Sequence, residues 1–297
     1  MQDKTKKVQR RIFLKFLIID GYSRQSRDKL AEAGMSLAWQ LYARMLQNVL
    51  PEAEYTVFHP SDSGAQFPKS HDLDGIDALM WTGADLNINH QHVPSITSQI
   101  ELAKLAYEVG VPSCGSCWGI QMAAVAAGGR VEPNPRGREM GIGRKIALTD
   151  EGRSHPMMEG KPRVYDGFES HYDMVTELPD GAVVLAGNDF APIQAMAVQH
   201  KRGSFWATQY HPEYNLHEMA RLTIARAEVL TEHGFFQNSS EVEPYVGRWE
   251  ELHRDPSRKD LRWQLGIDDS ILNTEIRQQE FYNWIHRLVI PRAQKTR

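Results

Sequence analysis

Residues 111–121 read Val-Pro-Ser-Cys-Gly-Ser-Cys-Trp-Gly-Ile-Gln, and this stretch decides the interpretation of the whole chain. Its small and apolar residues predict a buried strand that runs through a sharp turn into an Ala-rich helix. Cys117 stands near the turn between two glycines, where a nucleophile is lifted clear of its neighbours and a substrate can approach closely. A helix N-terminus also favours the thiolate, the reactive form of cysteine. We predict that Cys117 is a nucleophile; the alternative is a small buried apolar residue.

The stretch from Phe205 to Glu213 supplies a histidine and a carboxylate for such a nucleophile. Its aromatic and β-branched residues predict a strand that ends at His211, because Pro212 cannot continue the pairing. Residues two apart in extended chain project to the same side, so His211 and Glu213 can face one way. An imidazole held by a carboxylate can take the thiol proton and later give it to a leaving amine. On its own, His211 would be interpreted as a structural or surface histidine; with Glu213 and Cys117 it is the predicted catalytic base.

The stretch from Ala78 to Asp85 is an apolar strand that breaks at Gly83. A glycine just past a strand end can present its backbone N–H to a neighbouring site, as one half of an oxyanion hole. The backbone N–H of Trp118, next to the predicted nucleophile, would be the other half. The alternative for Gly83 is an ordinary loop glycine.

Strands and helices are expected to alternate along the first part of the chain. Strands are predicted at residues 12–20, 55–59 and 78–82, and helices at residues 26–50, 95–109 and 216–233. This alternation predicts an α/β fold with a mostly parallel central sheet flanked by helices. Ligands bind such sheets at the carboxyl ends of the strands, where Gly83, Cys117 and His211 all fall. Between residues 131 and 168, frequent Gly and Pro residues predict short antiparallel strands and loops.

Five motifs together resemble the class I glutamine amidotransferase family, and within it most of all the glutaminase domains of GMP synthases. They cover roughly residues 10–235 and occur in the family's order, so a chance match is improbable. In order, the motifs are Trp81-Thr82-Gly83-Ala84-Asp85, Gly115-Ser116-Cys117-Trp118-Gly119-Ile120-Gln121, Arg138-Glu139-Met140-Gly141, Ser170-His171-Tyr172-Asp173 and His211-Pro212-Glu213.

The resemblance implies a flavodoxin-like fold and an amidohydrolase that forms a γ-glutamyl thioester on Cys117 and releases glutamate with ammonia or an amine. It also implies that Gln121 and the segment Ser170, His171 and Tyr172 hold the amino-acid end of the substrate. The chain departs from the family at three positions. The family usually has aliphatic residues where Ser116 and Cys114 stand, and a second glycine where Thr82 stands. These departures concern the substrate more than the class of reaction.

The chain is expected to divide into a catalytic domain at residues 1–235 and a helical C-terminal extension at residues 236–297. Residues 270–288 predict an amphipathic helix in the extension. We expect this helix to pack on the core, with a lid or a partner-binding role as the alternative. Its apolar positions are Leu272, Ile276, Trp284, Ile285 and Leu288.

Composition limits the other functions. A formal charge of -4 over 297 residues, without a basic patch, argues against nucleic-acid binding. The apolar run at residues 12–19 is too short for a secretory signal, and no stretch is long enough to span a membrane. The charged residues Lys4, Lys6, Lys7, Arg10 and Arg11 before that run are expected to be a solvated end.

The two cysteines, Cys114 and Cys117, allow no disulfide framework, so a reducing compartment, the cytoplasm, is expected. Their Cys-Gly-Ser-Cys spacing could also mark a redox motif, although this would leave the His211 and Glu213 pattern unexplained.

Neither a metal nor another cofactor is expected, because His155, His171 and His217 lack metal-ligand spacing with cysteines or carboxylate pairs. The expected partner is a small γ-glutamyl substrate. Three alternatives stay open: a stand-alone hydrolase, a glutaminase subunit that delivers ammonia to a separate synthase or synthetase chain, and a glutamine-sensing module without turnover. The chain could also form a homo-oligomer.

Overall fold

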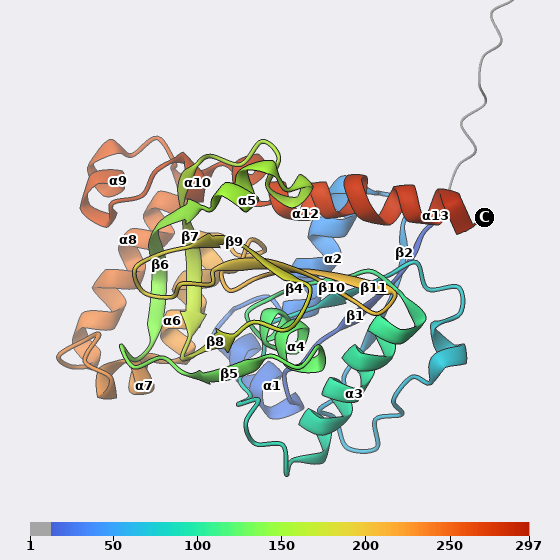
Figure 1. The fold of residues 1–297 in the computed structure, drawn as a ribbon. Coiled ribbons are helices and arrows are strands. Elements are labelled where there is room, and N and C mark those ends of the chain that lie inside the picture. Colours follow the sequence, from blue (N-terminus) through green and yellow to red (C-terminus); the bar gives the residue numbers. More distant parts are fainter. Residues whose placement is uncertain (1–12, 297) are drawn as a thin grey trace, which may run out of the picture.

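The computed structural model describes residues 13–296, and these residues form one large sheet with helices on both faces (Figure 1). Within this part of the chain the large sheet has nine strands. In spatial order they are β2 (Glu54–Phe58), β1 (Lys15–Ile19), β3 (Ala78–Trp81), β4 (Ser113–Ser116), β11 (Gly203–Thr208), β10 (Ala195–His200), β9 (Ala182–Gly187), β6 (Glu139–Leu148) and β7 (Val164–His171).

The half of the sheet from β2 to β11 is parallel, whereas β10, β9, β6 and β7 continue it with antiparallel pairing. The predicted sheet, mostly parallel at its centre and flanked by helices, is therefore confirmed. In the register, Trp81 lies opposite Gly115, and Ser116 opposite Thr208. The carboxyl ends of β3, β4 and β11 consequently meet at one edge. Four antiparallel steps bring the carboxyl end of β7, at His171, to that same edge.

One face of the sheet is covered by helices α3 (Pro94–Val109) and α4 (Trp118–Ala126). Their apolar side chains form one core with alternate residues of the central strands, including Leu79 and Phe205. A small antiparallel sheet of β5 (Arg130–Pro133) and β8 (Asp173–Glu177) packs against α4. Because both faces are covered, β1 and β3 carry apolar residues at nearly every position, and β4 carries small residues that are all buried.

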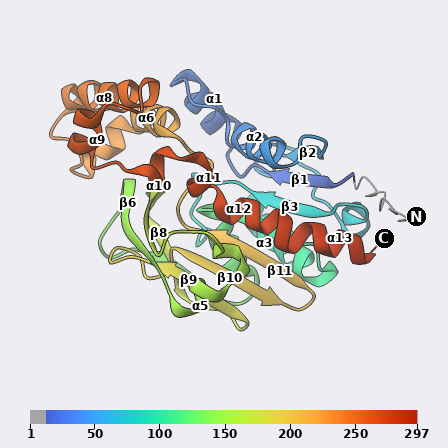
Figure 2. The same cartoon turned by 90° about the horizontal axis from the view of Figure 1, so that it is seen from above.

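The opposite face is covered by α2 (Ala38–Val49) and by the C-terminal end of the chain, which crosses the sheet in Figure 2. The side chain of Trp284 is buried there, with its ring centroid 6.1 Å from that of Phe16 on β1. This packing on the core is what the amphipathic pattern led us to expect. The covering segments are α12 (Gln279–Asn283), a π-helical turn (Trp284–Val289) and α13 (Ile290–Thr296).

A third apolar cluster lies beside β6 and β7. It joins the N-terminal helix α1 to the helices that follow β11, and α6 and α8 pack closely together (Figure 2). Among the described residues, no helix combines the length and apolar character that crossing a membrane requires. The remaining helices are α1 (Arg24–Glu32), α5 (Asp150–Ser154), α6 (Leu216–Ala225), α7 (Ala227–Glu232), α8 (Val242–Arg254), α9 (Lys259–Leu265), α10 (Asp269–Leu272) and α11 (Thr274–Arg277).

Three helix predictions were wrong in their continuity. The helix expected at residues 216–233 is two helices, α6 and α7, separated at Arg226. The single helix expected at residues 26–50 is two helices, because Gly34 takes a left-handed backbone conformation (φ +84°) after α1. The helix expected at residues 270–288 is divided where the Asn273 side chain caps α11 by accepting backbone N–H bonds. Short 3₁₀ turns at residues 70–73 and 156–158 were not anticipated. The basic cluster at residues 4–11 and the first residue of the predicted strand at 12–20 lie outside the described residues.

Candidate active site

Cys117 lies at the sharp turn between β4 and α4, as predicted. Its backbone has φ +51° and ψ -93°, a conformation that costs of order 1–3 kcal/mol for a residue with a side chain. The surrounding contacts hold it there: the Cys117 N–H donates to the carbonyl of Thr208 over 2.8 Å. A Cβ atom on Gly115 would lie 2.6 Å from the Trp81 carbonyl oxygen, so only glycine lets β4 approach β3 this closely. The strain therefore occurs at the predicted nucleophile.

His211 and Glu213 come together just beyond the end of β11. Nδ1 of His211 lies 2.6 Å from Oε1 of Glu213, and both side chains are almost fully buried. The ring of Tyr214 stacks on the imidazole, with centroids 4.1 Å apart and planes within 2°. The backbone N–H of His211 donates to the Phe168 carbonyl on β7 over 2.8 Å. The imidazole is thus fixed in position and orientation from three sides.

The electrostatic surroundings favour a protonated His211. Burial lowers its pKa, but the Glu213 charge and interactions with the Cys117 thiol outweigh this effect and raise the pKa from 6.5 to about 9. Nε2 has no hydrogen-bond partner within residues 13–296 and so can exchange a proton with a substrate group. The three predicted triad residues therefore interact in one place.

Two hydroxyl groups, those of Ser116 and Tyr42, extend this arrangement. Oγ of Ser116 donates to Oε1 of Glu213 over 2.9 Å, and the Tyr42 hydroxyl donates to Oγ of Ser116 over 2.8 Å. In the sequence, Ser116 stands out only as a departure from the family pattern. Tyr42 belongs to α2, far from the motifs in sequence, and its periodicity indicates nothing more than a core position.

The two residues predicted to form an oxyanion hole flank the triad. Gly83 lies against the imidazole, since a Cβ atom there would be 2.9 Å from Cε1 of His211. Trp118 begins α4, and its indole Nε1 donates to Oε1 of Gln99 over 2.9 Å, which anchors the first turn of the helix. Both residues are therefore next to the triad. Neither is among the residues that line the cavity described below.

A cavity of about 430 Å³ opens beside Cys117. It is lined by every residue predicted to hold the substrate, and also by charged residues that were not predicted as site residues. The lining residues are Ala84, Asp85, Leu86, Asn87, Cys117, Gln121, Arg138, Ser170, His171, Tyr172, Asp173, Arg226, Val229 and His233.

Arg138 and Arg226 bring two guanidinium groups to this cavity. Arg226 donates to Oγ of Ser170, while Nε of Arg138 is buried without a hydrogen-bond partner among the described residues. Burial lowers the pKa of Arg138, and the charge of Arg226 lowers it further. Two positive charges at one cavity repel each other, and an anionic ligand between them would form hydrogen bonds with both guanidinium groups. Arg138 belongs to a quoted motif, but Arg226 lies in the turn between α6 and α7 and could not be singled out from sequence.

Behind the cavity, His171 joins two buried carboxylates, Glu139 and Glu169, whose potential ligand atoms lie within 4.8 Å of one another. The spacing of these residues along the sequence does not indicate a cluster, because they come together only when β6 pairs with β7. Both ring nitrogens of His171 are engaged: Nδ1 lies 3.0 Å from the Asp173 carbonyl oxygen and Nε2 3.0 Å from Oε2 of Glu139. Burial, and then the Glu139 charge, raise the pKa of Glu169 well above its ordinary value. These contacts hold the end of β7 beneath Cys117.

The two cysteines have different surroundings. Cys117 lines the cavity, whereas Cys114 points to the opposite face of the sheet and packs in the core with α2. Burial raises the pKa of the Cys114 thiol well above its usual value, and the Glu213 charge adds to this. Neither cysteine forms a disulfide. Cys114 is therefore a packing residue rather than half of a redox pair.

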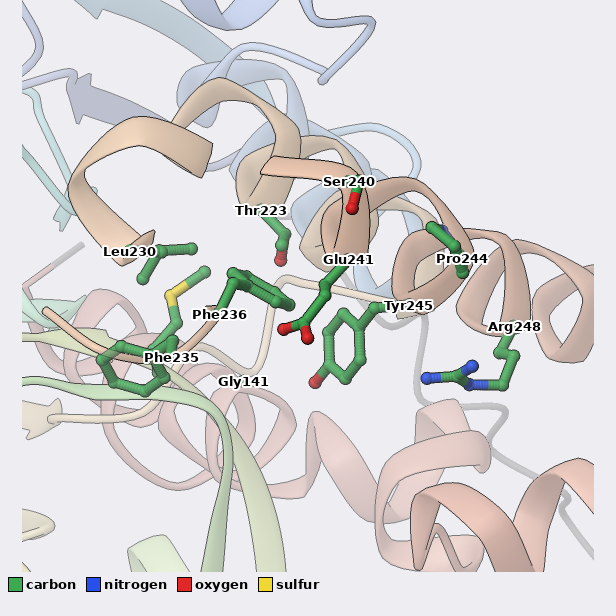
Figure 3. A pocket seen from close by; sticks show the side chains of 11 residues that line it. Gly141, Thr223, Leu230, Phe235, Phe236, Ser240, Glu241, Pro244, Tyr245 and Arg248 are labelled. Carbon is green, nitrogen blue, oxygen red and sulfur yellow. The ribbon is translucent and has the colours of Figure 1, made fainter. Parts of the chain in front are cut away.

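A second cavity of about 480 Å³ lies between β6 and helices α6 to α8. Figure 3 shows the Glu241 carboxylate among the rings of Phe236 and Tyr245, with Arg248 at one side. None of the three triad residues lines this space. We therefore assign the candidate active site to the cavity beside Cys117.

Comparisons with known sequences agree with this geometry. Residues 52–227 match the family described as glutamine amidotransferase class-I. A γ-glutamyl-L-1-hydroxyisopropylamide hydrolase from a Pseudomonas species is 32% identical over 288 residues, which cover 95% of each chain. A GMP synthase from Nitrosomonas eutropha is 32% identical over 177 residues, which cover 58% of this chain and 32% of the synthase. The chain thus spans about a third of that synthase.

Solved structures with this fold include two glutamine amidotransferases. One from Thermotoga maritima has a TM-score of 0.61 and 16% identity, and the match covers 86% of this chain and 100% of the other. One from Methylobacillus flagellatus has a TM-score of 0.57 and 20% identity, over 74% of this chain and 78% of the other. At these identities the likeness concerns the fold.

Proposed function

The chain belongs to the class I glutamine amidotransferase family, and we propose that it hydrolyses the side-chain amide of glutamine or of a γ-glutamyl amide at Cys117. The main support for this proposal is that Cys117 interacts with the His211 and Glu213 pair beside a cavity of about 430 Å³. A nucleophile, a proton carrier and a carboxylate that orients it are the groups that acyl transfer through a thioester requires.

In the first half of the reaction, the Cys117 thiolate attacks the carbonyl carbon of the side-chain amide. The carbonyl oxygen becomes an oxyanion, which the backbone N–H groups of Gly83 and Trp118 stabilise. The tetrahedral intermediate collapses when its C–N bond breaks. The His211 imidazolium gives its Nε2 proton to the departing nitrogen, so ammonia or an amine leaves and the γ-glutamyl thioester stays on the enzyme.

In the second half, water attacks the thioester. Neutral His211 takes a proton from this water, and the C–S bond breaks to release glutamate and restore the Cys117 thiolate. Glu213 stays ionised throughout, because its task is to orient the imidazole and stabilise its protonated form. The 2.6 Å contact between Nδ1 and Oε1 supports that assignment.

Substrate binding is assigned to the residues around the cavity. Gln121 and the segment Ser170 to Tyr172 would hold the amino-acid end of the substrate, and the guanidinium groups of Arg138 and Arg226 would pair with its carboxylate. Arginine suits this role because its fork of N–H donors matches the geometry of a carboxylate. The hydrogen bond from Arg226 to Oγ of Ser170 supports a joint role for these two residues.

A stand-alone hydrolase is favoured over an ammonia-delivering subunit. The γ-glutamyl amide hydrolase matches almost the full length of this chain, including the C-terminal extension, whereas the GMP synthase matches only residues equivalent to a third of its own length. Ammonia delivery to a separate synthase is the second candidate, since the family relationship to GMP synthases supports it.

The test is a screen of purified protein with glutamine and a series of γ-glutamyl alkylamides, with release of glutamate as the readout. We expect turnover without any partner, and a larger kcat/KM for an alkylamide than for glutamine. Cys117→Ala should abolish it, while Cys114→Ala, the matched cysteine control, should retain it. A diazo-ketone analogue of glutamine should label Cys117 alone. Activity that appears only with a synthase would favour the second candidate, and glutamine binding without turnover would identify a sensing module.

A further inference from the structure

A buried chain of hydrogen bonds continues the triad beyond Glu213. Oε1 of Glu213 accepts one hydrogen bond from Nδ1 of His211, at 2.6 Å, and another from Oγ of Ser116, at 2.9 Å. Ser116 has no exposed surface, and the Tyr42 hydroxyl lies 2.8 Å from its oxygen. One carboxylate oxygen is thus held between an imidazole and a hydroxyl.

The chemistry of the groups fixes the direction of each bond. An ionised carboxylate can only accept, so the single proton of the Ser116 hydroxyl points to Glu213. The Tyr42 hydroxyl must then donate to Ser116. Both O–H dipoles have their positive ends toward the carboxylate, and beyond it toward His211.

Local structure explains how these residues meet. In strand β4, Cys114 and Ser116 project to the same face, which α2 covers. Tyr42 is on the buried side of α2. Ser116 directly precedes Cys117, so it joins the backbone of the nucleophile to the carboxylate of the triad. An aliphatic residue at position 116 would pack there but could not donate.

We propose that Ser116 and Tyr42 are positioning residues that fix the Glu213 carboxylate against His211 and disperse its negative charge. The inference rests on the proposed function. If Ser116 lost its hydroxyl, the charge of Glu213 would no longer be dispersed, so the carboxylate would attract the imidazolium more strongly and draw the ring out of its catalytic alignment. The first effect raises the pKa of His211 further above 6.5, and the second slows the chemical step.

Other ionisable groups surround the pair. Tyr22 and Arg226 act on Tyr214 and Cys117 from further away. His211 is faced by Glu213, by Cys117 at the start of α4 and by the stacked ring of Tyr214. Tyr42 from α2 and Cys114 from β4 are close enough to feel the charge of Glu213. Burial raises the pKa of Tyr42 and of Cys114 well above their ordinary values, so both stay neutral while His211 titrates.

The kinetic test compares Ser116→Ala, Tyr42→Phe and the double variant with the unmodified protein. A hydrogen bond to a charged group, when felt only in the transition state, corresponds to a rate factor of about ten or more. We expect Ser116→Ala to lower kcat about tenfold with little change in KM, and Tyr42→Phe to lower it less. Because Tyr42 acts through Ser116, the double variant should resemble Ser116→Ala instead of multiplying the two losses.

The matched control is Tyr165→Phe, which removes a buried hydroxyl bonded to the Tyr210 hydroxyl at 3.0 Å and not to Glu213. It should leave kcat and the pH profile unchanged. If both Ser116→Ala and Tyr42→Phe fold and behave like this control, the proposal is overturned. Should Ser116→Ala fail to fold, Tyr42→Phe decides, since it keeps the ring and removes one atom.

An NMR titration of His211 separates this proposal from the proposed function, because it needs no turnover. The imidazole should titrate at higher pH in Ser116→Ala than in the unmodified protein, and Tyr165→Phe should not shift it. This result would support the hydrogen-bond chain even if no γ-glutamyl substrate were hydrolysed. An unchanged His211 titration in Ser116→Ala would overturn it even if the hydrolase activity were established.

Discussion

Gly83→Ala is predicted to disable catalysis while leaving the fold and the substrate contacts in place. A Cβ atom at Gly83 would lie 2.9 Å from Cε1 of His211, whereas ordinary contact begins near 3.4 Å. The imidazole must therefore move by about half an ångström or more, and the ring of Tyr214 stacked on it resists that movement. A displacement of about 1 Å at a reacting group costs about 10²-fold in rate, so we expect kcat to fall at least about tenfold.

The assay is hydrolysis of a γ-glutamyl alkylamide, with KM and kcat measured separately. KM should stay within about twofold, because Gly83 is not among the cavity-lining residues and its backbone N–H is retained in alanine. Gly247→Ala is the matched control: a Cβ there meets nothing within 4 Å, and alanine favours the helix that contains it. Full activity in Gly83→Ala, with an unchanged melting temperature, would refute the placement of His211 against this glycine.

Three further predictions follow from contacts elsewhere in the structure. Arg138→Gln should raise KM about tenfold with a smaller effect on kcat, because a charge-assisted bond to the substrate is lost; the exposed neighbour variant Arg136→Gln, measured in parallel, should leave KM unchanged. The pKa of His211 is raised from 6.5 to about 9, so its contribution to stability is complete below about pH 6.5 and is lost as the pH rises through about 9. Urea unfolding across this range should show that loss, and Glu213→Gln should reduce it. Trp284→Ala should lower the free energy of unfolding by about 3–5 kcal/mol in the same urea assay, since the indole is buried against the sheet; a loss below 1 kcal/mol would mean that the C-terminal segment is not part of the core.

The parts of the fold that could be predicted are those with a local signal. Two strand–helix–strand units, β1–α2–β2 and β3–α3–β4, contribute to the parallel half of the sheet, because such crossover connections have one handedness. The breaks within the predicted helices also have a local explanation. Apolar residues continue at helical spacing across Gly34 and Asn273, so the pattern predicts one continuous helix although each of these residues favours a turn. The antiparallel half depends on pairing between strands distant in sequence, which no single stretch reveals.

The candidate site divides in the same way. Cys117, His211 and Glu213 were identified because each sits in a motif with a strand end, and parallel strands bring their ends together. Tyr42 was not predicted because the apolar stripe of α2 does not indicate that one member reaches a site, and Arg226 was not predicted because it lies outside every motif, in the turn after α6. Their contacts with Ser116 and Ser170 form only in the folded chain, between residues distant in sequence.

The distribution of charge around Cys117 suits a reaction that develops negative charge. Arg138 and Arg226 border the cavity, and His211 is protonated below about pH 9. Burial, and then the Glu139 charge, raise the pKa of the buried Glu169 carboxyl on β7 well above its ordinary value, which favours its neutral form. If Glu169 were ionised, it would oppose the oxyanion that forms beside Cys117. A neutral Glu169 adds no further negative charge near the reacting carbonyl, and this favours the tetrahedral intermediate, in which the oxyanion forms.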